Sequence, residues 1–198
     1  RITNPYGSVN SADCTLAVRD VPVFLSQPAS QTVNQGANLT LSASASGRAP
    51  LTYRWYRNGY LLPGAASGAL TIASAQPSDA GNYTVLVANS DGSVTSQPAA
   101  VTVRQAPFML APTYTLNVPI GGGVTLLANI GGTAPMTYQW RFNGTNIAGA
   151  TSNTFPIVNI QISQEGTYSV VASNLLGSLT CNVAVVTVKS PPVITRHP

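Results

Sequence analysis

The sequence predicts an all-β protein built from tandem antiparallel β-sandwiches. The first observation is internal repetition, since Trp55 recurs as Trp140 and Tyr83 recurs as Tyr168, each pair 85 residues apart. The second is periodicity: short apolar runs alternate with polar residues, and no segment carries a sustained helical period. About seven short strands per copy are typical of a two-layer antiparallel sandwich.

The constant spacing also predicts where the repeats begin and end. Asn58-Gly59 returns as Asn143-Gly144, and the copies align without insertion or deletion. The joins are short and are followed by proline, so we expect them to be stiff. The predicted segments are the last strands of a preceding repeat at 1–18, complete repeats at 19–103 and 104–188, and the start of a following repeat at 189–198.

Within one repeat, the strands are expected in order along the chain. The first clear alternation covers 39–45, where leucine and alanine are separated by threonine and serine. Residues 53–57 form the next strand, which ends at Asn58-Gly59, a pair that readily adopts a type I′ hairpin turn. Further short strands are expected at 70–72, 83–87 and 101–103.

These motifs, in this order, resemble an intermediate-set immunoglobulin domain. The resemblance covers both repeats from end to end. Its markers in the first copy are Gly36, Leu41, Gly47, Pro50, Trp55, Asn58-Gly59, Asp79, Gly81, Tyr83, Asn89 and Gly92, and in the second copy Gly121, Leu126, Gly132, Pro135, Trp140, Gly166, Tyr168, Asn174 and Gly177.

The resemblance implies structural roles for four pairs of residues. It makes Trp55 and Trp140 the core tryptophans and Tyr83 and Tyr168 the tyrosine-corner residues. It also places small apolar residues where the family has an inter-sheet cystine. A bridge closing such a loop of about 42 residues would be worth about 4 kcal/mol, so both sandwiches must fold without it. The replaced pairs are Ala43 with Val85 and Ala128 with Val170.

Three further residues depart from strict repetition. Gln164 stands where the first copy has Asp79, so we expect the hydrogen bonding at the two tyrosine corners to differ. Cys14 follows an alternation that points it into the core. Cys181 lies off that alternation, so it is expected at the surface and is the candidate for a bond between two chains.

Composition argues against catalysis. Only 7% of residues are charged, with five acidic residues and one histidine in 198 residues. No cluster predicts a catalytic site, a metal site or a bound cofactor. The net charge of +4 comes from dispersed arginines rather than from a basic patch with stacking aromatics. We therefore expect neither an enzyme nor a nucleic-acid partner, and no apolar run is long enough to span a membrane in this segment.

The predicted function is that of an extracellular, non-catalytic structural or adhesive module. The chain reads as part of a tandem immunoglobulin-like array that acts as a spacer or stalk of a cell-surface or secreted protein, and its cysteine-poor copies resemble bacterial arrays more than animal receptors. Its expected partners are the neighbouring repeats. Two alternatives remain: a filament subunit that completes its strands with other copies of itself, and a module whose end loops bind surface glycans or proteins.

Overall fold

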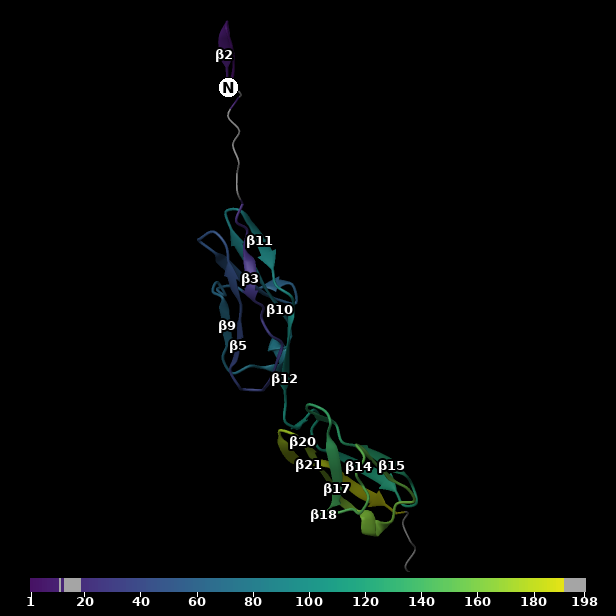
Figure 1. The fold of residues 1–198 in the computed structure, drawn as a ribbon. Helices are drawn as coiled ribbons and strands as arrows, with labels where there is room; N and C mark the ends of the chain where they lie inside the picture. The colour runs from purple at the N-terminus through teal and green to yellow at the C-terminus, as the bar shows by residue number, and fades with distance from the viewer. Residues whose placement is uncertain (11, 13–18, 191–198) are drawn as a thin grey trace, which may run out of the picture. The chain divides into compact units, whose positions relative to one another are not determined.

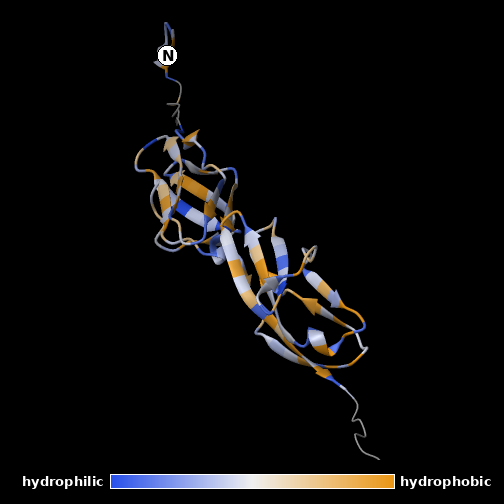
Figure 2. Cartoon of the chain, turned by 90° about the horizontal axis from the view of Figure 1, so that it is seen from below, coloured by the Kyte–Doolittle hydropathy of each residue, from blue (hydrophilic) through white to orange (hydrophobic). Residues whose placement is uncertain are grey.

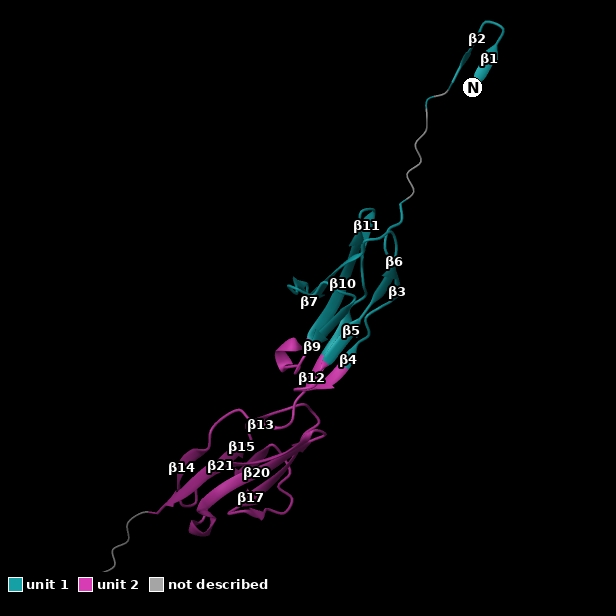
Figure 3. Ribbon diagram, turned by 90° about the vertical axis from the view of Figure 1, so that its left-hand side faces the viewer, with its two compact units in different colours: residues 1–31, 39–72, 81–101 teal, residues 32–38, 73–80, 102–198 magenta. Residues whose placement is uncertain are grey.

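A computed structural model describes residues 1–10, 12 and 19–190 (Figure 1). By its contacts the chain divides into two compact units, coloured separately in Figure 3. One unit lies within residues 1–31, 39–72 and 81–101, and the other within 32–38, 73–80 and 102–198. These units do not follow the 85-residue spacing, so the repeat boundaries given above stay predictions.

The first complete copy contains one large sheet and two short strand pairs. The sheet has the order β4 (Gln31–Asn34), β12 (Ala99–Arg104), β10 (Gly81–Asn89), β7 (Thr52–Arg57) and β8 (Tyr60–Leu61), with β11 (Gly92–Thr95) also paired to β10. The short pairs join β3 (Val23–Ser26) to β6 (Ser44–Ser46) and β5 (Leu39–Ser42) to β9 (Ala69–Ile72). A 3₁₀ turn, η1 (Pro77–Asp79), precedes β10.

The second copy repeats this plan. Its large sheet has the order β14 (Tyr114–Pro119), β21 (Gly177–Lys189), β20 (Gly166–Asn174), β17 (Thr137–Phe142) and β18 (Thr145–Asn146). The short pairs join β13 (Phe108–Met109) to β16 (Ile130–Gly131) and β15 (Val124–Leu127) to β19 (Thr154–Ile157), and η2 (Ile162–Gln164) precedes β20. Near the N-terminus, β1 (Ile2–Asn4) and β2 (Gly7–Val9) form a separate hairpin.

In the second copy, one strand pairing departs from the antiparallel expectation. β14 runs parallel to β21, with Leu116 opposite Val186. The preceding strand, β13, pairs with β16 outside the large sheet. After Pro112 the chain joins the large sheet beside its last strand and runs in the same direction, which makes this pairing parallel.

Hydrophobic and hydrophilic residues alternate along strands of both copies (Figure 2), and buried hydrophobic side chains form the cores. In β5, Leu39 and Leu41 are fully buried while Thr40 is exposed. The second core adds tilted aromatic contacts, with ring centroids of Phe155 lying 5.7 Å from Trp140 and 6.0 Å from Tyr168. Such pairs stabilise a core beyond the area that they bury.

The predicted hairpin turns are confirmed. Asn58 and Gly59 have φ angles of 50° and 83°, and Asn143 has 46°, the positive values that a type I′ turn requires. The Asn58 side chain also accepts a hydrogen bond of 2.9 Å from the backbone N–H of Asn82, which ties the turn to β10.

Candidate functional site

The tryptophans expected in the cores lie there and have the same partner in both copies. Trp55 and Trp140 are fully buried. The indole N–H of Trp55 donates to the backbone carbonyl of Ser67 at 2.9 Å, and that of Trp140 donates to Ser152 at 2.9 Å. Each buried indole N–H therefore has a hydrogen-bond acceptor, as a stable core requires.

The small apolar pairs that replace the family cystines are also buried. Val85 and Val170 have no exposed surface, and Ala43 and Ala128 retain only a few per cent. All four residues therefore contribute to closed apolar cores. Cysteines introduced at these positions would restore the inter-sheet cystine of the family.

The tyrosine corner of the second copy is closed by a hydrogen bond of the Tyr168 hydroxyl. The hydroxyl of the buried Tyr168 donates to the backbone carbonyl of Gln164 at 3.0 Å. Burial raises the pKa of Tyr168, because desolvation disfavours the phenolate. Tyr83, its counterpart in the first copy, is fully buried as well.

Asp79 and Gln164 cap equivalent turns in the two copies, and the expected difference in hydrogen bonding at the tyrosine corners themselves stays a prediction. The Asp79 carboxylate accepts from the backbone N–H of Gln76 at 2.8 Å, and the Gln164 side-chain carbonyl accepts from that of Gln161 at 2.9 Å. Both side chains thus cap their 3₁₀ turns in the same way. A glutamine side chain is one methylene longer, but its amide oxygen reaches the same donor, so the substitution preserves the cap.

The expectation that Cys181 lies at the surface is wrong. Its side chain is only 9% exposed and lies opposite Val170 in the β20–β21 ladder. The reason is a β-bulge: Tyr168 pairs with Ala184 but Ser169 pairs with Asn182, so β21 carries an extra residue at Val183. One inserted residue exchanges the inward and outward positions of a strand, which turns Cys181 inward. Cys14 lies outside the described residues.

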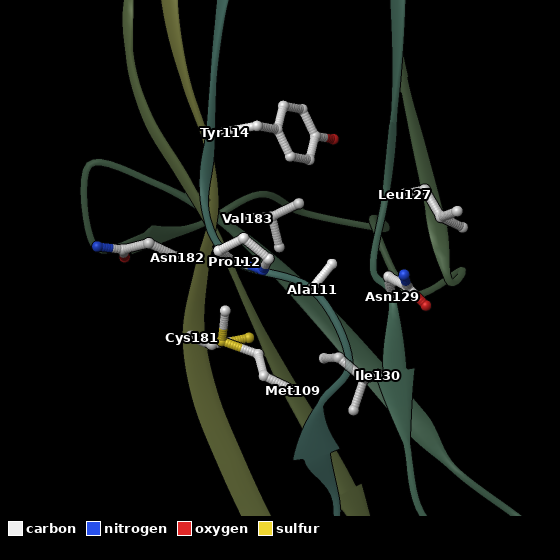
Figure 4. Close-up of a pocket in the computed structure, with 10 residues that line it drawn as sticks. All are labelled: Met109, Ala111, Pro112, Tyr114, Leu127, Asn129, Ile130, Cys181, Asn182 and Val183. Carbon is white, nitrogen blue, oxygen red and sulfur yellow. The ribbon is translucent and has the colours of Figure 1, made fainter.

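Cys181 lines a small apolar cavity of about 20 Å³ (Figure 4). Met109 lies beside the thiol, and Val183, Tyr114 and Leu127 line the part of the cavity farther from it. Burial raises the pKa of the Cys181 thiol, and a thiol is a poorer nucleophile than a thiolate. The cavity has room for about one water molecule, so it suits packing rather than ligand binding.

The end loops of the first copy use their polar groups internally. The side-chain amide of Asn89 donates to the backbone carbonyls of Asp20 at 2.7 Å and Arg48 at 3.1 Å. Asp91 forms an ion pair of 3.2 Å with Arg48 and accepts from the backbone N–H of Asp20 at 3.1 Å. These contacts hold the hairpin tip against its neighbouring loops.

The same asparagine recurs in the other hairpins. The amide of Asn174 donates to the carbonyls of Gln105 at 2.7 Å and Thr133 at 2.9 Å. Asn4, in the β1–β2 hairpin, accepts a turn hydrogen bond of 2.9 Å from the backbone N–H of Tyr6, as Asn89 does from that of Asp91. The asparagine is thus a structural feature of the repeat rather than a ligand-binding group.

The hairpin tips themselves differ in chemistry. Tyr6 is 97% exposed and Leu175 is 82% exposed, whereas Asp91 is engaged by Arg48. No group of three or more histidine, cysteine, aspartate or glutamate side chains in the described ranges could hold a metal ion. In the same part of the chain, no helix is long and apolar enough to span a membrane.

Comparison with known proteins agrees with this architecture. The chain is 29% identical to mouse hemicentin-2 over 206 residues, covering 99% of this chain and 4% of that protein. It is 30% identical to chicken neurofascin over 179 residues, covering 83% of this chain and 13% of that protein. The structure of Sidekick-1 immunoglobulin domains 1–4 superposes with a TM-score of 0.67 at 25% identity, covering 90% of this chain and 49% of that one.

The chain therefore spans only a small fraction of the curated relatives that it matches. These relatives come from animals, and the resemblance to bacterial arrays stays a prediction. The model of the immunoglobulin domain family matches residues 21–89 and 108–174, which is well over half of the chain. Two copies of the sandwich, each with its buried tryptophan and tyrosine, account for both matches. The chain belongs to the immunoglobulin domain family.

Proposed function

We propose that this chain is a non-catalytic structural and adhesive module, a segment of a tandem immunoglobulin-like array that acts as a spacer or stalk. The observation that carries the proposal is duplication. Each copy closes its own core around one buried tryptophan and ties its own hairpin tip to its neighbouring loops. A series of similar, self-contained units suits a load-bearing spacer.

The proposal also assigns this module a cellular location and partners. We place the module outside the cell, on a cell-surface or secreted protein, because the curated relatives named above are proteins of that kind. Its first partners are neighbouring immunoglobulin-like repeats of the same protein. Surface glycans or proteins are the further partners that an adhesive role requires.

Single-molecule pulling tests the spacer role. The full chain, tethered at both ends, should show two separate unfolding events. Each event should release about 250 Å, because about 85 extended residues at 3.3–3.6 Å each replace one folded copy. A single event that releases the whole chain, or extension without a force peak, would contradict the spacer proposal.

The adhesive role needs its own test. Beads coated with the chain should bind glycan or protein arrays, or aggregate with one another, more than beads coated with an unrelated β-sandwich. The filament alternative predicts polymers that disappear when residues 1–18 are removed. Polymers that persist in that variant would exclude strand exchange through this end.

A further inference from the structure

The outer edge of β7 in the first copy is only partly paired. Its ladder with β8 covers Tyr56 and Arg57, and no residue before them. At Trp55 the same edge is still occupied, because the Trp55 carbonyl accepts from the N–H of Leu62 at 2.8 Å and the Trp55 N–H donates to Ala65 at 3.4 Å. Residues 62–65 form a turn at this point, in which the N–H of Ala65 donates to the carbonyl of Leu62 at 3.3 Å and Gly64 has a φ of 81°.

Tyr53 is therefore left with free backbone groups at this edge. In an antiparallel ladder, the N–H and C=O of residues two apart point to the same side. Because those of Trp55 point away from β10, those of Tyr53 do so too. The β7–β8 pairing and the turn contacts in the described chain provide no partner for them.

A groove runs along this free edge. One wall is residues 51–54 and the other is residues 61–66, and the space between them measures about 410 Å³. Most of its lining is apolar, including Leu51, Leu62 and Ala65, and its one charged residue is Arg54. The side chain of Arg54 is exposed, and its guanidinium group forms no hydrogen bond or ion pair with any described residue.

The geometry points to a docking site for an extended, acidic peptide segment, which would add to β7 as an edge strand. Two separate features select this partner. The unpaired backbone of Tyr53 requires an extended backbone, as in strand addition. Side chains of an added strand alternate, so those facing inward meet the apolar groove and those facing outward meet Arg54. The segment is therefore an acidic residue flanked by small apolar residues.

The second copy provides an internal comparison. Gln139 stands at the position of Arg54, and its side-chain amide donates to the carbonyls of Trp140 at 2.9 Å and Ile147 at 2.8 Å. This side chain lies against its own edge and brings no positive charge to it. We expect no preference for acidic segments there. The inference goes beyond the spacer role and does not depend on it.

The test uses the full ¹⁵N-labelled chain and the peptide acetyl-Thr-Val-Glu-Val-Thr-amide. At peptide concentrations on the order of 1 mM, the range expected for so small an interface, the amide signals of Tyr53, Arg54 and Ala65 should shift. Those of Tyr138 and Gln139 should shift less. No shift at Tyr53, or larger shifts elsewhere, would overturn the proposal.

Modified peptides separate backbone pairing from charge. In an antiparallel addition, the residue that pairs with Tyr53 is one of the two inward-facing valines. N-methylation of both valines should therefore abolish the shifts, whereas N-methylation of the glutamate should preserve them. A peptide with lysine in place of glutamate should bind more weakly. Equal binding by the valine-methylated peptide would exclude strand addition.

Variants of the chain test the role of Arg54. Arg54→Gln should weaken binding of the glutamate peptide about two- to fivefold, as expected for one exposed ion pair, and should not weaken binding of the lysine peptide. Lys189→Gln removes the same charge from the exposed end of β21 and should leave both affinities unchanged. An Arg54→Gln variant that still prefers the acidic peptide would contradict the assignment.

Discussion

At the scale of single residues, the hydroxyl of Tyr168 connects the core to the turn before β20. Tyr168→Phe keeps the ring and removes the 3.0 Å hydrogen bond to the carbonyl of Gln164. We expect the free energy of unfolding of this copy to fall by about 1 kcal/mol, measured by urea unfolding. Tyr114→Phe is the matched control, because Tyr114 is exposed and its hydroxyl bonds to no described residue. An equal loss in both variants would contradict this role.

The same residue predicts a loss of stability at alkaline pH. The folded-state pKa of Tyr168 is raised by burial above its ordinary value of about 10. Below about pH 10 Tyr168 is protonated in both the folded and the unfolded state, so its contribution to the free energy of unfolding is fully present. As the pH rises above this value, the unfolded state loses its proton first, and the free energy of unfolding must fall. Unfolding of the chain between pH 8 and 11 should show a steeper decline than unfolding of Tyr168→Phe, and parallel curves would exclude the effect.

At the scale of elements, the bulge in β21 decides the chemistry of Cys181. In the Cys14→Ala variant, Cys181 is the remaining cysteine. Because Cys181 faces inward, we expect its thiol to react slowly with a thiol reagent in the native protein and rapidly in urea. Non-reducing electrophoresis of this variant should show no dimer. Cys181→Ser should be tolerated, because Ser96 occupies the equivalent position in the first copy, where it is buried and accepts from the N–H of Val85 at 3.0 Å. Rapid labelling of the native thiol would contradict the burial.

Restoring the missing inter-sheet bridge tests the pairing of the core positions. Ala43→Cys combined with Val85→Cys should form a cystine under oxidising conditions. It should raise the free energy of unfolding by up to about 4 kcal/mol, less any strain. The reduced double variant is the control, since it contains the same two cysteines without the bond between them. Failure to oxidise would show that the two positions do not face one another.

The sequence predicted the strands better than it predicted their edges. Alternation located Leu39 and Leu41 correctly, and Asn58-Gly59 located the hairpin turn, because each signal is carried by neighbouring residues. The inward turn of Cys181 was missed, because a bulge is defined by the register with a second strand. The groove beside Tyr53 was missed for a related reason: it depends on where β8 ends and how the following turn departs.

At the scale of the whole molecule, the question is whether the two copies unfold independently. Each copy contains one of the two tryptophans, so Trp140→Phe leaves Trp55 as a reporter of the first copy, and Trp55→Phe leaves Trp140 as a reporter of the second. Since each indole lies in a separate core, we expect the fluorescence transition of each variant to differ in midpoint from the far-UV circular dichroism of the whole chain.

The slope of those transitions adds a second criterion. The dependence of unfolding free energy on urea concentration scales with the surface exposed, so fluorescence should report the slope of a unit of about 85 residues rather than of the whole chain. Coincident midpoints with the slope of a single 170-residue unit would mean one cooperative block. The two compact units group residues 32–38 and 73–80 with 102–198 and so differ from the 85-residue repeats, which is why the measurement must distinguish one cooperative block from two. Independent transitions would instead support boundaries at the 85-residue repeats and, with them, the spacer role.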